Sequence, residues 1–126
     1  MPLTKVIFFQ EADGTSPVVE WLRQLRKHDV RVYAKCRLRI ERLAELGYEL
    51  RRPEADVLRD GIYELRFRLG SMNYRILYFF HGRNVAILAH GITKEDEIPD
   101  VEINRSLARK TAFEKAPEKH TYTEEL

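Results

Sequence analysis

The sequence predicts an α+β domain in which a helical hairpin covers one face of an antiparallel sheet, and three observations support this. Apolar residues recur every three or four positions between residues 17 and 46, which is the spacing of amphipathic helices. Residues 61–92 form three β-rich runs separated by short glycine-containing segments. A further helix is expected near residues 100–113. The predicted order is an N-terminal strand, two helices, a three-stranded meander and a C-terminal helix.

The N-terminal elements have recognisable start and stop signals. Residues 5–9 (KVIFF) are β-branched and aromatic and indicate a first strand. Ser16 followed by Pro17 is typical of a helix start, and Asp29 can cap a second helix that Gly47 ends. The expected apolar stripes are Val18, Trp21, Leu22 and Leu25 in the first helix and Tyr33, Cys36, Ile40 and Leu43 in the second.

The first strand of the predicted meander alternates apolar and charged side chains. Residues 61–69 place Glu64, Arg66 and Arg68 on one face, and Gly70-Ser71 has the composition of a two-residue type II′ turn. Residues 72–80 and 84–92 follow as strands, joined by a turn near residues 81–82. The face expected to pack on the helices carries Tyr63, Leu65, Phe67, Tyr74, Ile76, Tyr78, Val85 and Ile87.

This turn also sets a register. If Gly70-Ser71 is the whole turn, Arg66 lies opposite Arg75 on the face away from the helices. A second loop over residues 81–84 would then place His90 opposite Arg75, where a histidine can exchange protons near neutral pH. Two facing guanidinium groups can bind a phosphate between them. Pairing with Glu64, with an acidic group of the last helix or with a partner chain would also satisfy them.

Composition limits the class of protein. The 126 residues are 44% hydrophobic and 33% charged, with a net charge of +2, and they fit one domain over residues 1–115. Residues 116–126 are polar and contain Pro117, so a mobile tail is expected. Residues 23–52 hold ten Lys or Arg against four Asp or Glu, which either solvate the helices or attract a polyanion.

Other classes are disfavoured by the same composition. Cys36 is the single cysteine, which excludes an internal disulfide and favours a reducing compartment. The four histidines lack metal-ligand spacing. No apolar run approaches the roughly 18 residues of a membrane span, and residues 1–10 lack the form of a secretory signal. We therefore expect a cytoplasmic protein without a metal, a cofactor or a membrane partner.

A family resemblance rests on the segment LRDGIYELRFRLGSMNYRILYFF, a third strand, and HGITKEDEIP before a closing helix. It resembles the HigB-like, phage-derived toxin-like branch of the RelE/ParE toxin superfamily over about residues 5–112, most specifically over residues 58–99. The resemblance implies a RelE-like fold and the toxin of a type II toxin–antitoxin system. Its activity would be ribosome-dependent cleavage of mRNA by a metal-independent endoribonuclease, which inhibits translation.

The resemblance also implies roles for individual residues. Arg66 resembles the basic residue of the second strand, Arg75 the arginine of the Y-R motif, and Lys94 the lysine after the last strand. With Arg68 they would bind RNA, and Arg66 and Arg75 would stabilise the charge that develops on phosphorus during 2′-hydroxyl attack. His90 or Glu64 would transfer protons, with Lys94 assisting at the leaving oxygen.

The chain departs from the family at two points. The acidic residues Glu95, Asp96 and Glu97 follow Lys94, where relatives often have a second basic residue. A C-terminal tyrosine used by some ribosome-dependent relatives has no clear counterpart, since Tyr122 lies in the tail. Two alternatives therefore stay open, a non-enzymatic ParE-like gyrase inhibitor and an inactive antitoxin-binding module. The implied partners are a helix-turn-helix antitoxin and mRNA on the ribosome, with operator DNA bound only by the toxin–antitoxin complex.

Overall fold

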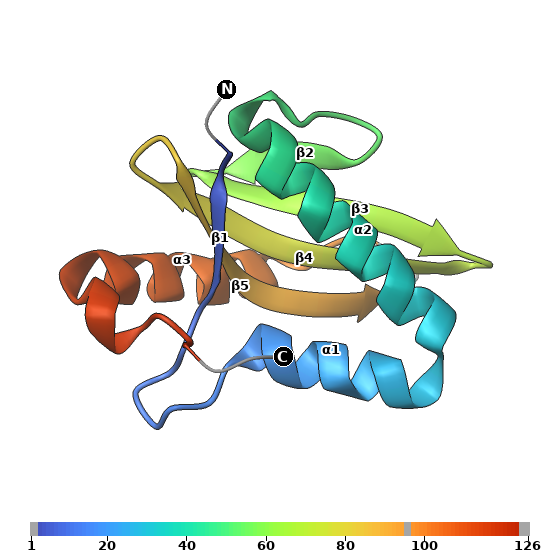
Figure 1. Ribbon diagram of the computed structural model, residues 1–126, viewed down its shortest axis with the longest axis horizontal. Helices are drawn as coiled ribbons and strands as arrows, with labels where there is room; N and C mark the ends of the chain where they lie inside the picture. The colour runs from blue at the N-terminus through green and yellow to red at the C-terminus, as the bar shows by residue number, and fades with distance from the viewer. Residues whose placement is uncertain (1–2, 95–96, 124–126) are drawn as a thin grey trace.

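A computed structural model describes residues 3–94 and 97–123. It has three α-helices and a five-stranded sheet (Figure 1). The elements in chain order are β1 (Lys5–Phe8), α1 (Pro17–His28), α2 (Val30–Leu46), the short 3-10 helix η1 (Gly47–Glu49), β2 (Ala55–Arg59), β3 (Ile62–Leu69), β4 (Met72–His81), β5 (Val85–Lys94), α3 (Asp100–Lys115) and the short 3-10 helix η2 (Pro117–Lys119).

The sheet has the order β1-β5-β4-β3-β2, with β1 parallel to β5 and the other neighbours antiparallel. The predicted meander β3–β4–β5 is its centre, but the prediction of a three-stranded meander missed part of the sheet. β1 joins it beside β5, and β2 pairs with β3 at the opposite edge. β2 was missed because its five residues, ADVLR, carry two charges and no apolar alternation, as short edge strands often do.

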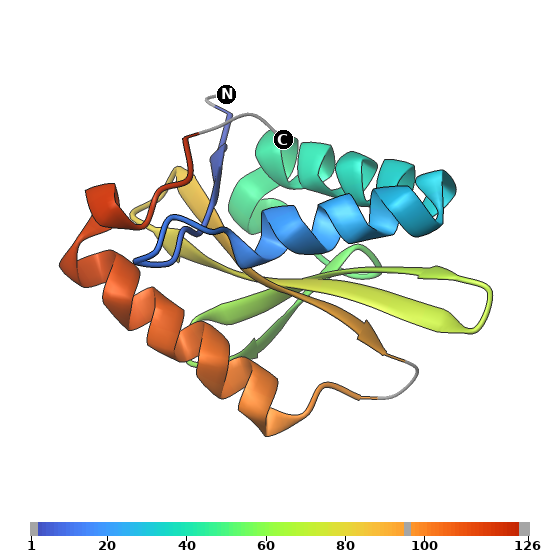
Figure 2. The same cartoon turned by 90° about the horizontal axis from the view of Figure 1, so that it is seen from below.

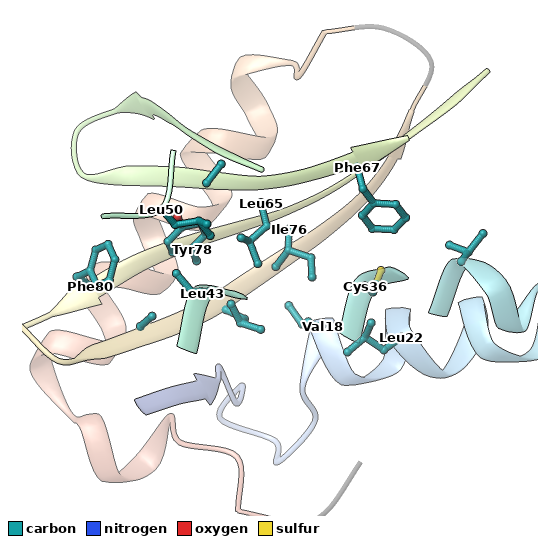
Figure 3. Packing of buried hydrophobic residues seen from close by; sticks show 14 residues of the cluster. Val18, Leu22, Cys36, Leu43, Leu50, Leu65, Phe67, Ile76, Tyr78 and Phe80 are labelled. Carbon is teal, nitrogen blue, oxygen red and sulfur yellow. The ribbon is translucent and has the colours of Figure 1, made fainter. Parts of the chain in front are cut away.

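The sheet lies between two helical layers (Figure 2). The predicted hairpin α1–α2 packs on one face, and α3 packs on the other. Beneath the hairpin lies a core that includes Leu22, Cys36, Leu43, Leu65, Ile76 and Tyr78 (Figure 3). A second core beneath α3 contains Phe9, Ile62, Leu77, Phe79, Ile87, Ala89, Ile92, Ile103 and Phe113.

Two of the residues predicted to face the hairpin lie on the other face. Val85 and Ile87 pack in the core beneath α3. The pairing of His81 with Val85 leaves a loop of residues 82–84, whereas the prediction required a loop with an even number of residues. An odd loop length exchanges the two faces of the following strand.

The signals for the ends of the hairpin helices are confirmed. The Ser16 side chain accepts a hydrogen bond from the backbone N–H of Val19, and the Asp29 side chain accepts one from Arg31. Gly47 ends α2 with φ of +53°, in the left-handed region that favours glycine. These contacts fix where α2 begins and ends relative to the sheet.

The described part of the C-terminal tail is attached to the domain. Thr121 forms a β-bridge with Phe9, and the backbone N–H of Tyr122 donates to Phe8 at 3.0 Å. Backbone pairing with β1 does not require apolar side chains, so a polar segment can form these contacts, and the mobility of the tail stays a prediction. Among the described residues, no helix combines the length and the apolar character needed to cross a membrane.

Candidate functional site

The face of the sheet that carries α3 is only partly covered. The core beneath α3 lies toward the β4–β5 turn, and the β3–β4 hairpin extends past the helix (Figure 2). On this extension the alternation of β3 and β4 turns polar side chains to the face opposite the helical hairpin. They are Glu64, Arg66, Arg68, Asn73 and Arg75.

The predicted register of β3 and β4 is confirmed. Arg66 pairs with Arg75, Arg68 pairs with Asn73, and the strands meet at Leu69 and Met72 around the Gly70-Ser71 turn. Gly70 has φ of +64°, which glycine adopts without strain. The local turn therefore places two guanidinium groups side by side on adjacent strands.

Glu64 accompanies this pair. Its Oε1 lies 3.4 Å from Nε of Arg66 and 3.9 Å from Nε of Arg75, and the residue is 4% exposed. Burial raises the pKa of Glu64, while the charges of Arg75 and Arg66 oppose that rise. The carboxyl therefore takes up a proton more readily than an exposed glutamate, and when ionised it is the counter-ion of both arginines.

The two arginines differ in access. The side chain of Arg66 is 31% exposed, and that of Arg75 is 13% exposed. An anion from solution therefore meets Arg66 first. Glu64 is too buried to be the first contact of any ligand.

A pocket of about 280 Å³ opens beside this pair. We call it the arginine pocket; it is lined by Arg39, Pro53, Arg66, Phe67, Arg68, Asn73 and Arg75. Arg39 was not predicted as a site residue, because the basic residues of α2 were assigned no individual role. A signal was present, since position 39 lies between the apolar positions 36, 40 and 43 and so borders the buried side of the helix.

His90 does not lie opposite Arg75, and this prediction was wrong. Arg75 pairs with Ile92, and His90 pairs with Leu77 next to a β-bulge in β5. The bulge restores the predicted face of His90, but it moves the histidine along the strand to a position beneath α3.

The surroundings of His90 fix its protonation. Its Nε2 lies 2.7 Å from Oε2 of Glu102, and its Nδ1 lies 2.9 Å from Nη1 of Arg109. Because arginine can only donate, Nδ1 accepts and Nε2–H donates to Glu102. Burial lowers the pKa of His90, which favours this neutral form. The histidine joins α3 to β5 and does not line the arginine pocket.

Of the other residues that the sequence singled out, Lys94 is described by its backbone. Lys94 pairs with Asn73 in the β4–β5 register, so its backbone adjoins a residue of the arginine pocket. The Lys94 side chain and residues 95–96 of the acidic run lie outside the described residues. Tyr122 contacts β1 and α1, where its hydroxyl accepts from Arg23. Within the described chain, no group of three or more His, Cys, Asp or Glu residues could hold a metal ion.

Comparison with known proteins identifies a family. A search of curated proteins finds no match. Residues 20–111 match the family model "Phage derived protein Gp49-like (DUF891)", so the match runs from α1 through most of α3 and includes every residue of the arginine pocket. This family is toxin-like. The chain therefore belongs to the Gp49-like family of phage-derived proteins, within the RelE/ParE-like toxin superfamily.

Proposed function

We propose that this protein is the toxin of a type II toxin–antitoxin system, of the HigB-like branch, and that it cuts mRNA on the ribosome. The observation that carries the proposal is the pair Arg66–Arg75 on the uncovered part of the sheet, joined by Arg39 and Arg68 in one pocket. Four guanidinium groups around 280 Å³ favour a ligand with several negative charges. Single-stranded RNA supplies such charges along its backbone.

The proposed chemistry needs no metal ion. The ribose 2′-oxygen forms a bond to the adjacent phosphorus while the bond from phosphorus to the 5′-oxygen breaks, which leaves a 2′,3′-cyclic phosphate and a 5′-hydroxyl. Arg66 and Arg75 stabilise the charge on the phosphorane oxygens. Glu64 is the proposed acceptor of the proton from the 2′-oxygen, and Lys94 is the proposed donor of the proton that the 5′-oxygen gains.

Glu64 is the remaining candidate for proton transfer, since His90 lies beneath α3. Burial raises its pKa, so the carboxyl holds a proton more readily than an exposed glutamate and can serve as an acid or a base. Its burial limits direct contact with RNA, so its first role is that of counter-ion to the two guanidinium groups. Catalysis by such a site is weak by itself, and the ribosome would contribute by aligning the RNA for in-line attack.

A second candidate function is that of an inactive antitoxin-binding module. It is favoured by the contacts of Glu64, whose carboxylate already neutralises part of the charge that a phosphate would meet. In both cases the proposed partner is a helix-turn-helix antitoxin, and operator DNA would be bound through the toxin–antitoxin complex.

The test is induced expression followed by mapping of mRNA 5′ ends. We expect growth arrest and cuts within translated codons, and Arg66→Ala should abolish both because it removes the most exposed guanidinium of the pair. Arg37→Ala is the matched control, since Arg37 is an exposed arginine of α2 outside the pocket. Arrest with intact mRNA and trapped DNA breaks would instead indicate a gyrase inhibitor. A folded protein without any effect on growth would indicate the inactive module.

A further inference from the structure

Arg39 crosses from the helical layer to the edge of the sheet. β2 begins at Ala55, which pairs with Leu65, so β3 runs on beyond its neighbour from Arg66. At this edge the backbone N–H of Arg66 donates to the carbonyl oxygen of Glu54 at 2.9 Å. The carbonyl oxygen of Arg66 accepts from Nε of Arg39 at 2.8 Å. The α2 side chain thus ends beside Arg66, the more exposed arginine of the pair that faces Glu64.

Glu54 is shared unequally between Arg42 and Arg39. Its carboxylate is held by Arg42, whose Nε and Nη2 donate at 2.9 Å and 3.1 Å, whereas Nη1 of Arg39 lies at 3.5 Å. The hydrogen bond from Arg42 is also the main reason why the pKa of Glu54 is lowered. Arg42 does not line the arginine pocket, but Arg39 does.

We propose that Arg39 and Arg68 form a second phosphate-binding position, so that the RNA strand crosses the edge of β3 between the β3–β4 hairpin and α2. Arg66 and Arg75 hold the phosphate that reacts, and Arg39 and Arg68 hold another phosphate of the same strand. This inference rests on the proposed function, which it extends by naming the path of the substrate. Arg39, Arg66, Arg68 and Arg75 line one open pocket, so a strand held at Arg66 and Arg75 can also reach Arg39 and Arg68.

The competing explanation is that Arg39 only holds Glu54 and the edge of β3. Arg42 separates the two explanations, because it lies one turn along α2 and binds the same carboxylate without reaching the pocket. The probe is a fluorescent 2′-O-methyl RNA octamer, which has no free 2′-hydroxyl and so cannot be cleaved. Its dissociation constant is measured by anisotropy over a range of NaCl concentrations for wild type, Arg39→Gln, Arg39→Lys and Arg42→Gln.

We expect Arg39→Gln to weaken binding about tenfold and to make the log–log salt dependence less steep by about 0.7, the loss of one phosphate contact to a single strand. Arg39→Lys should keep the slope, because the charge stays, while its affinity falls through loss of the bidentate fork. Arg42→Gln should keep the wild-type slope. Equal slopes and affinities for Arg39→Gln and Arg42→Gln would overturn the inference.

Folding and function are controlled separately. If thermal melting shows that Arg39→Gln does not fold, Arg68→Gln replaces it; an unchanged slope there also overturns the inference. Cleavage in cells that depends on Arg66, combined with wild-type binding by Arg39→Gln, would refute the second phosphate position and leave the proposed function intact. Binding that depends on Arg39, without any cleavage of mRNA, would support the position and refute the nuclease.

Discussion

Replacement of His90 by alanine should destabilise the protein and leave the proposed chemistry in place. The side chain is 13% exposed and lies between Oε2 of Glu102 and Nη1 of Arg109. Each partner keeps one other ionic contact after the substitution, Glu102 with Arg105 at 3.4 Å and Arg109 with Glu11 at 2.9 Å. The substitution therefore removes two hydrogen bonds to charged groups and leaves the other ionic contacts of Glu102 and Arg109 in place.

The magnitude follows from those two bonds. A hydrogen bond to a charged group contributes about 1.5–3 kcal/mol, and the surviving contacts place this case at the lower end. We expect the free energy of unfolding to fall by about 3 kcal/mol. For a chain of 126 residues this corresponds to a decrease in Tm of about 10 °C.

The stability lost should also depend on pH. Burial lowers the pKa of His90 below its ordinary value of 6.5. Just below pH 6.5, His90 is therefore protonated in the unfolded chain but still neutral in the folded chain. Wild-type stability therefore contains a contribution that is complete above pH 6.5 and declines as the pH falls toward the folded pKa. His90→Ala should lack this decline.

The assay is urea unfolding at pH 7.5 and pH 5 for wild type, His90→Ala and His28→Ala, followed by RNA cleavage at a temperature where all are folded. His28 is an exposed histidine at the end of α1 and controls for titration elsewhere. We expect cleavage by His90→Ala within about threefold of wild type. Unchanged stability combined with a loss of about 10²-fold or more, the contribution of a general acid or base, would refute this assignment.

Three further outcomes are expected. Glu64→Gln should bind the RNA octamer several-fold more tightly, since a negative charge 3.4 Å and 3.9 Å from two guanidinium nitrogens disappears; weaker binding would mean that the carboxylate is needed to position them. Burial raises the pKa of the Cys36 thiol to about 12, so a thiol reagent should label Cys36 only as fast as the protein unfolds, and rapid labelling of the folded protein would contradict the packing. Gly91→Ala should destabilise the fold by about 1–3 kcal/mol and change Trp21 fluorescence, because an added Cβ would lie 2.2 Å from that indole ring; a neutral effect on unfolding would show that the ring can move aside.

The features that the sequence determined are local ones. Ser16, Asp29 and Gly47 mark helix ends through contacts with residues a few positions away. The pairing of Arg66 with Arg75 follows from a two-residue turn only a few positions away, and the alternation of β3 leaves one choice of face. These are the features that predicted the helical hairpin, the central strands and three of the seven residues that line the arginine pocket, Arg66, Arg68 and Arg75.

Tertiary structure decided what depends on contacts between distant elements. A loop of three residues places Ile87 under α3, and a bulge in β5 moves His90 away from Arg75. The local sequence pattern is equally compatible with a loop of two or four residues and with a strand without a bulge. Arg39 reaches Arg66 only because β2 starts short of the end of β3, which leaves a backbone carbonyl at the sheet edge for the guanidinium to bind. The free energy of such long-range pairings comes from burying apolar side chains in two cores and from hydrogen bonds to backbone groups at the sheet edge. Both depend on residues far apart in the chain, so a short stretch of sequence does not reveal them.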